Sequence, residues 1–213
     1  MRNGTALPSS FGVNVTITLD QMMKMSNSEL YDIVRQAHPL DLDAIADMSY
    51  TGIDLSMPAW FHRLMWKSFR KTFHRDPVSG RIRGWNVKVE QVGWDTPPPP
   101  KRDSKGRALT FGHYEVRSAH GVSFPRGWTG PHYIDYRVAG NHFWEFPANA
   151  GFCPLVSVNA GSSDLLLGWE VFNVAGLKIP ISDFWVLKRE GPLAPADIMP
   201  RPNGTPAQPL LNS

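Results

Sequence analysis

Short segments in which apolar and polar residues alternate recur along most of the chain, and they restrict its fold more than any other feature. About eight such segments, rich in β-branched and aromatic residues, follow one another at intervals of roughly 10–20 residues. Helical periodicity is confined to the first third, so strands do not alternate with helices as they do in a parallel sheet. The sequence therefore predicts a mainly β fold, an antiparallel barrel or sandwich fronted by small helices.

The strands are expected at the following positions: 50–55, 67–75, 81–92, 108–118, 133–138, 154–159, 165–174 and 179–188. The segment 11–19 also alternates and predicts either a strand or an extended arm. Residues 59–74 fit two patterns, a helix with aromatic residues on one stripe or a strand. We favour a short helix over 58–65 followed by a hairpin, because 75–80 has good turn chemistry.

Three helical segments are expected before the first strand. A helical turn fits residues 20–25, and a helix capped by Ser26 or Ser28 fits the residues up to Ala37. A further short helix is expected over 41–48, with acidic residues in its first turn.

The length of 213 residues fits one domain with loose ends. We expect an N-terminal arm over 1–19, a single barrel domain over 20–190 and a flexible Pro-rich tail over 191–213. Four consecutive prolines at 97–100 predict an exposed loop between two strands.

Charge, cysteine content and motifs exclude several classes of function. The net charge is only +3, which argues against nucleic acid as a partner. Cys153 is the single cysteine, so the chain forms no internal disulfide, and a cytoplasmic location is expected. No apolar run reaches the ~18 residues of a membrane span. The phosphate-binding, dinucleotide-binding and HExxH motifs are absent, so we expect neither cofactor nor metal; the oligomeric state stays open.

Two pairs of polar residues on expected strands are candidates for acid–base chemistry. His113 and Glu115 are two residues apart and therefore share one face of a strand, as do Tyr133 and Asp135. In the barrel interior they could act as a general base and its orienting group. The alternative is a polar strand face that points to solvent.

Aromatic residues are the candidates for a ligand-binding wall. Barrels of about eight strands can hold one small molecule, and aromatic walls suit an apolar one. Core packing alone would also use such residues. The expected wall residues are Trp60, Trp66, Phe69, Trp85, Phe111, Trp169 and Trp185.

A run of basic residues overlaps the first part of this wall. Interleaved with tryptophans, these charges could bind phosphates or an anionic surface. The alternative is the solvated outer face of a hairpin. The residues are Arg63, Lys67, Arg70, Lys71, Arg75, Arg81, Arg83 and Lys88.

The stretch from 35 to 75 resembles the GXWXG-type family of small barrels. A short helix and His38-Pro39 precede the sequence MSYTG at 48–52, and WKSF follows at 66–69. Met48 stands where that family has Gly, and Tyr50 where it has Trp. The resemblance implies a lipocalin-like (calycin) antiparallel barrel with an apolar cavity, and it carries over no catalytic residue.

Three hypotheses for function follow. The first is binding of a hydrophobic or aromatic small molecule inside a lipocalin-like barrel. The second is a cofactor-free isomerase or cyclase of secondary metabolism that uses the polar strand residues. The third is an interaction module that uses the basic hairpin.

Overall fold

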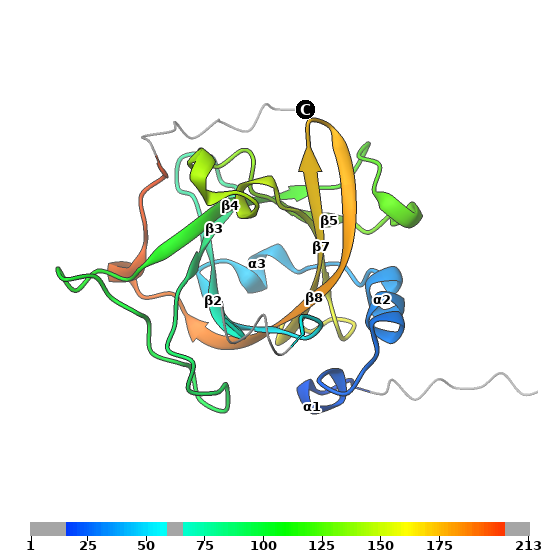
Figure 1. Cartoon of the computed structure of the whole chain (residues 1–213), viewed down its shortest axis with the longest axis horizontal. Coiled ribbons are helices and arrows are strands. Elements are labelled where there is room, and N and C mark those ends of the chain that lie inside the picture. The colour runs from blue at the N-terminus through cyan, green and yellow to red at the C-terminus, as the bar shows by residue number, and fades with distance from the viewer. Residues whose placement is uncertain (1–15, 59–65, 203–213) are drawn as a thin grey trace, which may run out of the picture.

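The computed structural model describes residues 16–58 and 66–202, and within them eight strands form one closed barrel. Every strand pairs antiparallel with its neighbour in sequence, and β8 pairs back to β1 (Figure 1). The prediction of a mainly β fold with an antiparallel barrel is confirmed. The strands are β1 (Met48–Asp54), β2 (Ser68–Arg75), β3 (Ile82–Val87), β4 (Thr110–Ser118), β5 (His132–Asp135), β6 (Phe152–Ser157), β7 (Leu165–Val174) and β8 (Leu177–Pro192).

Short helices precede the barrel, and each begins at a side-chain cap. Thr18 caps α1 (Leu19–Met22), Ser26 caps α2 (Asn27–Gln36) and Asp41 caps α3 (Leu42–Ile45). In the described ranges the loops contain four single 3₁₀ turns: η1 (Pro125–Gly127), η2 (Phe143–Glu145), η3 (Ala148–Ala150) and η4 (Pro195–Asp197). The short helix expected over 58–65 falls almost entirely on residues outside the described part of the chain.

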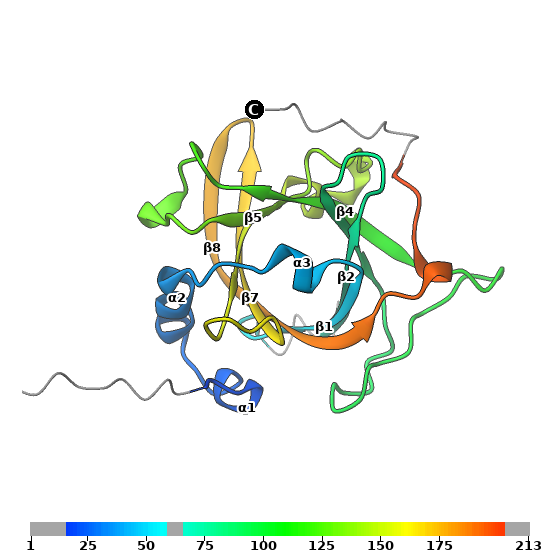
Figure 2. The same cartoon turned by 180° about the vertical axis from the view of Figure 1, so that it is seen from behind.

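The barrel interior is solid at one end. Tyr50, Phe73 and Tyr114 are completely buried and meet edge to face, with ring centroids 5.4 and 5.9 Å apart. Ile45 of α3 packs into the same cluster, and α3 lies across this opening of the barrel (Figure 2). The end of the barrel beside α3 is therefore closed by side chains.

A second apolar layer lies outside the barrel. Helix α2 packs on β6, β7 and β8, and its buried Leu30, Ile33 and Val34 contact outward-facing residues such as Trp169 and Phe184. Side chains successive along a strand point to opposite faces. Leu167, Trp169 and Val171 thus face α2, while Leu166, Gly168 and Glu170 face the interior.

Residues 191–202, the described part of the segment expected as a flexible tail, lie against the outer face of the barrel. Strand β8 continues to Pro192, and Leu193 and Met199 cover Trp85 on the outside of β3. Arg201 is then bonded to Asp76 and Glu115. Ion pairs of Arg201 hold this segment against the barrel. A search for hydrophobic periodicity in the sequence does not detect ion pairs, so it did not predict the contact. The domain limits at 1–19 and 191–213 stay a prediction.

Candidate functional site

A cavity of about 370 Å³ occupies the end of the barrel opposite α3. Strands β1, β2, β3, β4, β7 and β8 all contribute side chains to its lining. Its apolar wall consists of Met57, Trp66, Phe69, Phe111, Pro147, Ala148, Phe172, Ile181 and Trp185. Six polar groups interrupt this wall: Asp54, Lys71, Asn86, Tyr136, Glu170 and Asp183.

Lys71 is the most unusual of the polar groups, because a lysine is rarely buried without an acidic partner. It is 1% exposed, and its Nζ contacts Asn86 Oδ1 at 2.8 Å and Tyr136 Oη at 2.6 Å. Among the described residues no carboxylate forms an ion pair with it. Strand β2 explains the position, because Phe69 and Phe73 point inward and the residue between them must do the same.

Four aromatic rings surround the Lys71 amine. The Nζ atom lies 4.6 Å from the ring centroid of Tyr114 and 4.8 Å from that of Trp185, with Tyr136 and Phe69 at 5.2 and 5.5 Å. Burial lowers the pKa of Lys71 to about 7, against a smaller opposing effect of Cys153 and Glu170. Near neutral pH a substantial fraction of this amine is therefore uncharged.

Three carboxyl groups lie on the other side of the cavity. Burial raises the pKa of Glu170, and Trp185 Nε1 donates to its Oε2 at 3.1 Å. Burial, with the nearby charges of Asp54 and Glu170, raises the pKa of Asp183 to about 8. Asp54 is fixed by the backbone N–H groups of Ser56 and Met57, at 2.9 and 2.8 Å. The cavity thus combines a lysine whose pKa is lowered with two carboxyl groups, Glu170 and Asp183, whose pKa values are raised.

Two irregularities in the barrel position these groups. Between the pairs Trp169–Phe184 and Val171–Pro180 the register of β7 and β8 shifts, which sets Glu170 opposite the stretch that holds Asp183. A second shift occurs between β3 and β4, where Asn86 Nδ2 donates to Gly112 O at 3.1 Å. Gly112 has φ +54°, and a Cβ there would lie 2.8 Å from Asn86 Nδ2.

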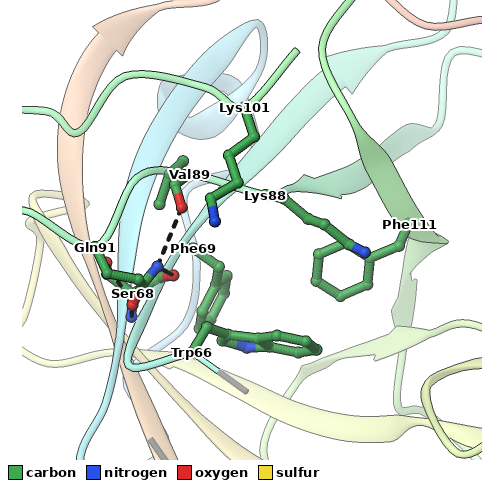
Figure 3. Close-up of a pocket in the computed structure, with 8 residues that line it drawn as sticks. All are labelled: Trp66, Ser68, Phe69, Lys88, Val89, Gln91, Lys101 and Phe111. Carbon is green, nitrogen blue, oxygen red and sulfur yellow. Dashed lines mark hydrogen bonds between the residues drawn. The ribbon is translucent and has the colours of Figure 1, made fainter. Parts of the chain in front are cut away.

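A second hollow of about 360 Å³ lies beside the cavity and shares its aromatic wall. Trp66, Phe69 and Phe111 line both spaces (Figure 3). Lys88, Lys101 and Gln91 also line it, and Gln91 Nε2 donates to Ser68 O at 2.8 Å. This side pocket is more polar in its lining residues than the main cavity.

The four residues proposed for acid–base chemistry lie outside the barrel. Tyr133 packs on Phe152 in the outer layer, and Asp135 is bonded to Arg137 at 2.9 Å. Glu115 accepts from Arg201 at 3.0 Å. The ring of His113 is tilted by 35° against that of Trp85, with centroids 6.0 Å apart, and the C-terminal segment covers Trp85. The strand pairing does bring Glu115 opposite Asp135, but both point away from the cavity. None of the four residues lines the cavity, and their catalytic role stays a prediction.

The residues expected to form a ligand wall divide between the two faces of the barrel. Trp66, Phe69, Phe111 and Trp185 line the cavity. Trp85 and Trp169 lie in the outer layer, where Trp169 Nε1 donates to Ile181 O at 2.9 Å. Trp60 lies outside the described residues.

The basic run does not form a single charged surface within the described part of the chain. Lys71 points into the barrel, and four arginines of the run have acidic partners. These pairs are Arg70–Glu190, Arg75–Asp43, Arg81–Glu115 and Arg83–Asp76.

No motif identifies the six polar cavity residues, but the alternation of residues along the strands contains a signal for four of them. Lys71 lies between Phe69 and Phe73, and Glu170 lies between Gly168 and Phe172 in an apolar strand. Once the neighbours at i−2 and i+2 are assigned to the interior, each charged residue must also be inside. The same signal exists for Tyr136, which lies between Ile134 and Val138, and for Asp183, which lies between Ile181 and Trp185. Asp54 and Asn86 do not have two apolar side chains at these positions.

No group of three or more His, Cys, Asp and Glu side chains within 16–58 and 66–202 is arranged to hold a metal ion. In the same residues, none of the helices has the length and apolar character that crossing a membrane requires.

Together, the fold and the cavity define a closed up-and-down β-barrel whose interior is packed at one end and holds a cavity at the other, an architecture compatible with a lipocalin-like fold. Comparison with models of protein families, with curated proteins and with solved structures finds no match for the chain. Membership of the GXWXG-type family therefore stays a prediction.

Proposed function

We propose that this protein binds a hydrophobic or aromatic small molecule in the barrel cavity. The observation that carries the proposal is the cavity of about 370 Å³, which lies within the usual range for ligand pockets and has a predominantly apolar and aromatic wall. The polar groups lie at defined positions in that wall, so the ligand is expected to be apolar with one polar function.

Fluorescence of N-phenyl-1-naphthylamine, a neutral aromatic probe, tests this proposal. Binding should raise the emission of the probe and quench tryptophan, because Trp66 and Trp185 line the cavity. A Phe172→Arg variant places a charge in the wall and should weaken binding at least about tenfold. Val174→Arg, two residues further along β7 at an exposed position, is the matched control and should bind as the wild type does.

Saturable binding that Phe172→Arg removes and Val174→Arg retains would support the proposal. Equal binding by both variants, or no saturable binding by the wild type, would contradict it.

A cofactor-free isomerase is the second candidate, and the opposite pKa shifts of Lys71 and Asp183 in one cavity favour it. A partly uncharged lysine can accept a proton at neutral pH, and a carboxyl with a pKa of about 8 can donate one. Incorporation of deuterium from solvent next to the carbonyl of 2-tetralone, followed by NMR, tests such proton transfer. Loss of this exchange in Asp183→Asn with probe binding intact would support the candidate; exchange no faster than in buffer would contradict it.

A further inference from the structure

We propose that the cavity takes a ligand with an aldehyde or ketone group and that Lys71 condenses with this group to form an imine. The inference rests on the proposed binding function and names the ligand's polar group. It depends on three features of the site: the place of the amine, the groups beside it and the charges around the cavity.

The first feature is the place of the amine. Lys71 extends from β2 toward the cavity, and its only polar partners among the described residues are Asn86 and Tyr136. Burial lowers the pKa of this amine to about 7, so a substantial fraction of it is uncharged at pH 7. Imine formation requires the uncharged form, because only the unprotonated nitrogen has a lone pair with which to attack the carbonyl carbon.

The second feature is the pair of groups beside the nitrogen. Asn86 is held by its own bond to Gly112 O, so its Oδ1 is a fixed acceptor for an N–H of Lys71. Burial raises the pKa of Tyr136 well above its usual range, so its hydroxyl remains protonated. That hydroxyl, 2.6 Å from Nζ, can donate to the oxygen of the attacked carbonyl.

The reaction balances without an oxidant or a reductant. Nζ forms a bond to the carbonyl carbon and gives a carbinolamine. The oxygen then leaves as water with the two hydrogens of the amine, and a C=N bond remains. Protonation of the imine leaves one N–H, for which Asn86 Oδ1 is the acceptor.

The third feature is the charge around the cavity, which favours a neutral carbonyl over a carboxylate. Asp54, Glu170 and Asp183 line the same space, and an anionic ligand would be repelled by any of them that is ionised. A neutral carbonyl group on an apolar body avoids this repulsion and suits the aromatic wall.

The test uses 2-naphthaldehyde with sodium cyanoborohydride at pH 7, which reduces an imine to a stable amine. Mass spectrometry of the digested protein should find the naphthylmethyl adduct on Lys71 at least about tenfold faster than on the exposed Lys24. An excess of 2-naphthalenemethanol, which has the same ring but no carbonyl, should suppress labelling of Lys71 and leave that of Lys24 unchanged.

Two variants complete the experiment. Lys71→Met should abolish the fast adduct, and Lys24→Met should retain it. If Lys71→Met fails to fold, the peptide map of the wild type still decides the question, because it assigns the adduct to one lysine. If both naphthyl compounds displace N-phenyl-1-naphthylamine but Lys71 is not labelled preferentially, the imine is overturned and the binding function stands. If neither compound nor the probe binds, both proposals are overturned.

Discussion

Lys71 and Asp183 show how position inside a barrel changes the chemistry of ordinary side chains. In water a lysine is charged and a carboxyl group ionised at pH 7. Burial lowers the pKa of Lys71 to about 7 and raises that of Asp183 to about 8. Such shifts are concentrated at functional sites, and both groups line one cavity.

The shifted pKa of Lys71 predicts a specific dependence of stability on pH. Between about pH 7 and 10 the unfolded chain binds the proton of this residue and the native protein does not, so this group makes stability rise with pH. We expect Lys71→Met to be more stable than the wild type at pH 7. The difference in the free energy of unfolding, measured with urea, should shrink toward pH 10. A difference that stays constant over this range would contradict the assigned pKa.

Asp183 predicts the opposite dependence. Its native pKa of about 8 exceeds the unfolded value of about 4, so between these limits the native state holds the proton more tightly. The contribution of this group to stability is therefore fully present below pH 4 and is lost as pH rises through 8. Asp183→Asn should gain stability relative to the wild type over this range. Asp164→Asn, at an exposed position, is the control. A gain by Asp183→Asn that does not grow as pH rises through 8 would contradict the assigned pKa.

At the scale of the strands, register shifts rather than regular pairing place the polar groups of the cavity. The irregularity of β4 at Gly112 supports Asn86, and the irregularity between β7 and β8 sets Glu170 near Asp183. Extra residues of this kind are common at barrel rims and beside functional sites.

Gly112 offers a direct test of the β4 irregularity. Gly112→Ala combines a positive φ with a clash against Asn86, and should cost about 2–4 kcal/mol of stability. Gly121→Ala has a similar positive φ but no atom within 4 Å of the added Cβ, and should cost only about 1 kcal/mol. Thermal unfolding of both variants separates the two effects, and equal losses would show that the contact with Asn86 contributes nothing.

At the scale of the whole molecule, the C-terminal segment connects distant parts of the barrel surface. Arg201 bonds Asp76, in the turn between β2 and β3, and Glu115 on β4. Burial on its own would raise the pKa of Asp76. The N–H groups of Ser79 and Val78 together with Arg201 outweigh it and lower the pKa to about 2.

Removal of this contact should therefore destabilise the protein. We expect Arg201→Met to lower the free energy of unfolding by about 1–3 kcal/mol, since it leaves two nearly buried carboxylates with fewer partners. Arg107→Met breaks an exposed pair with Asp103 and should change stability far less. Urea unfolding at pH 7 makes the comparison, and equal losses would show that the segment does not stabilise the barrel.

The sequence by itself determined the mainly β, antiparallel character of the fold, because alternation of apolar and polar residues encodes strands locally. The pairing of β8 with β1, which closes a barrel and not a sandwich, is seen only in the tertiary structure. It also indicated most of the aromatic wall, since Trp66, Phe69, Phe111 and Trp185 lie in strands or next to them. Only the tertiary structure decided which face of each strand is inside. Both faces of this barrel are covered by apolar residues, so alternation does not distinguish the interior from the layer beneath α2 and the C-terminal segment. For that reason the sequence could not show that His113, Glu115, Tyr133 and Asp135 point outward. Nor could it show that Lys71, unlike the other described basic residues of its run, points into the barrel.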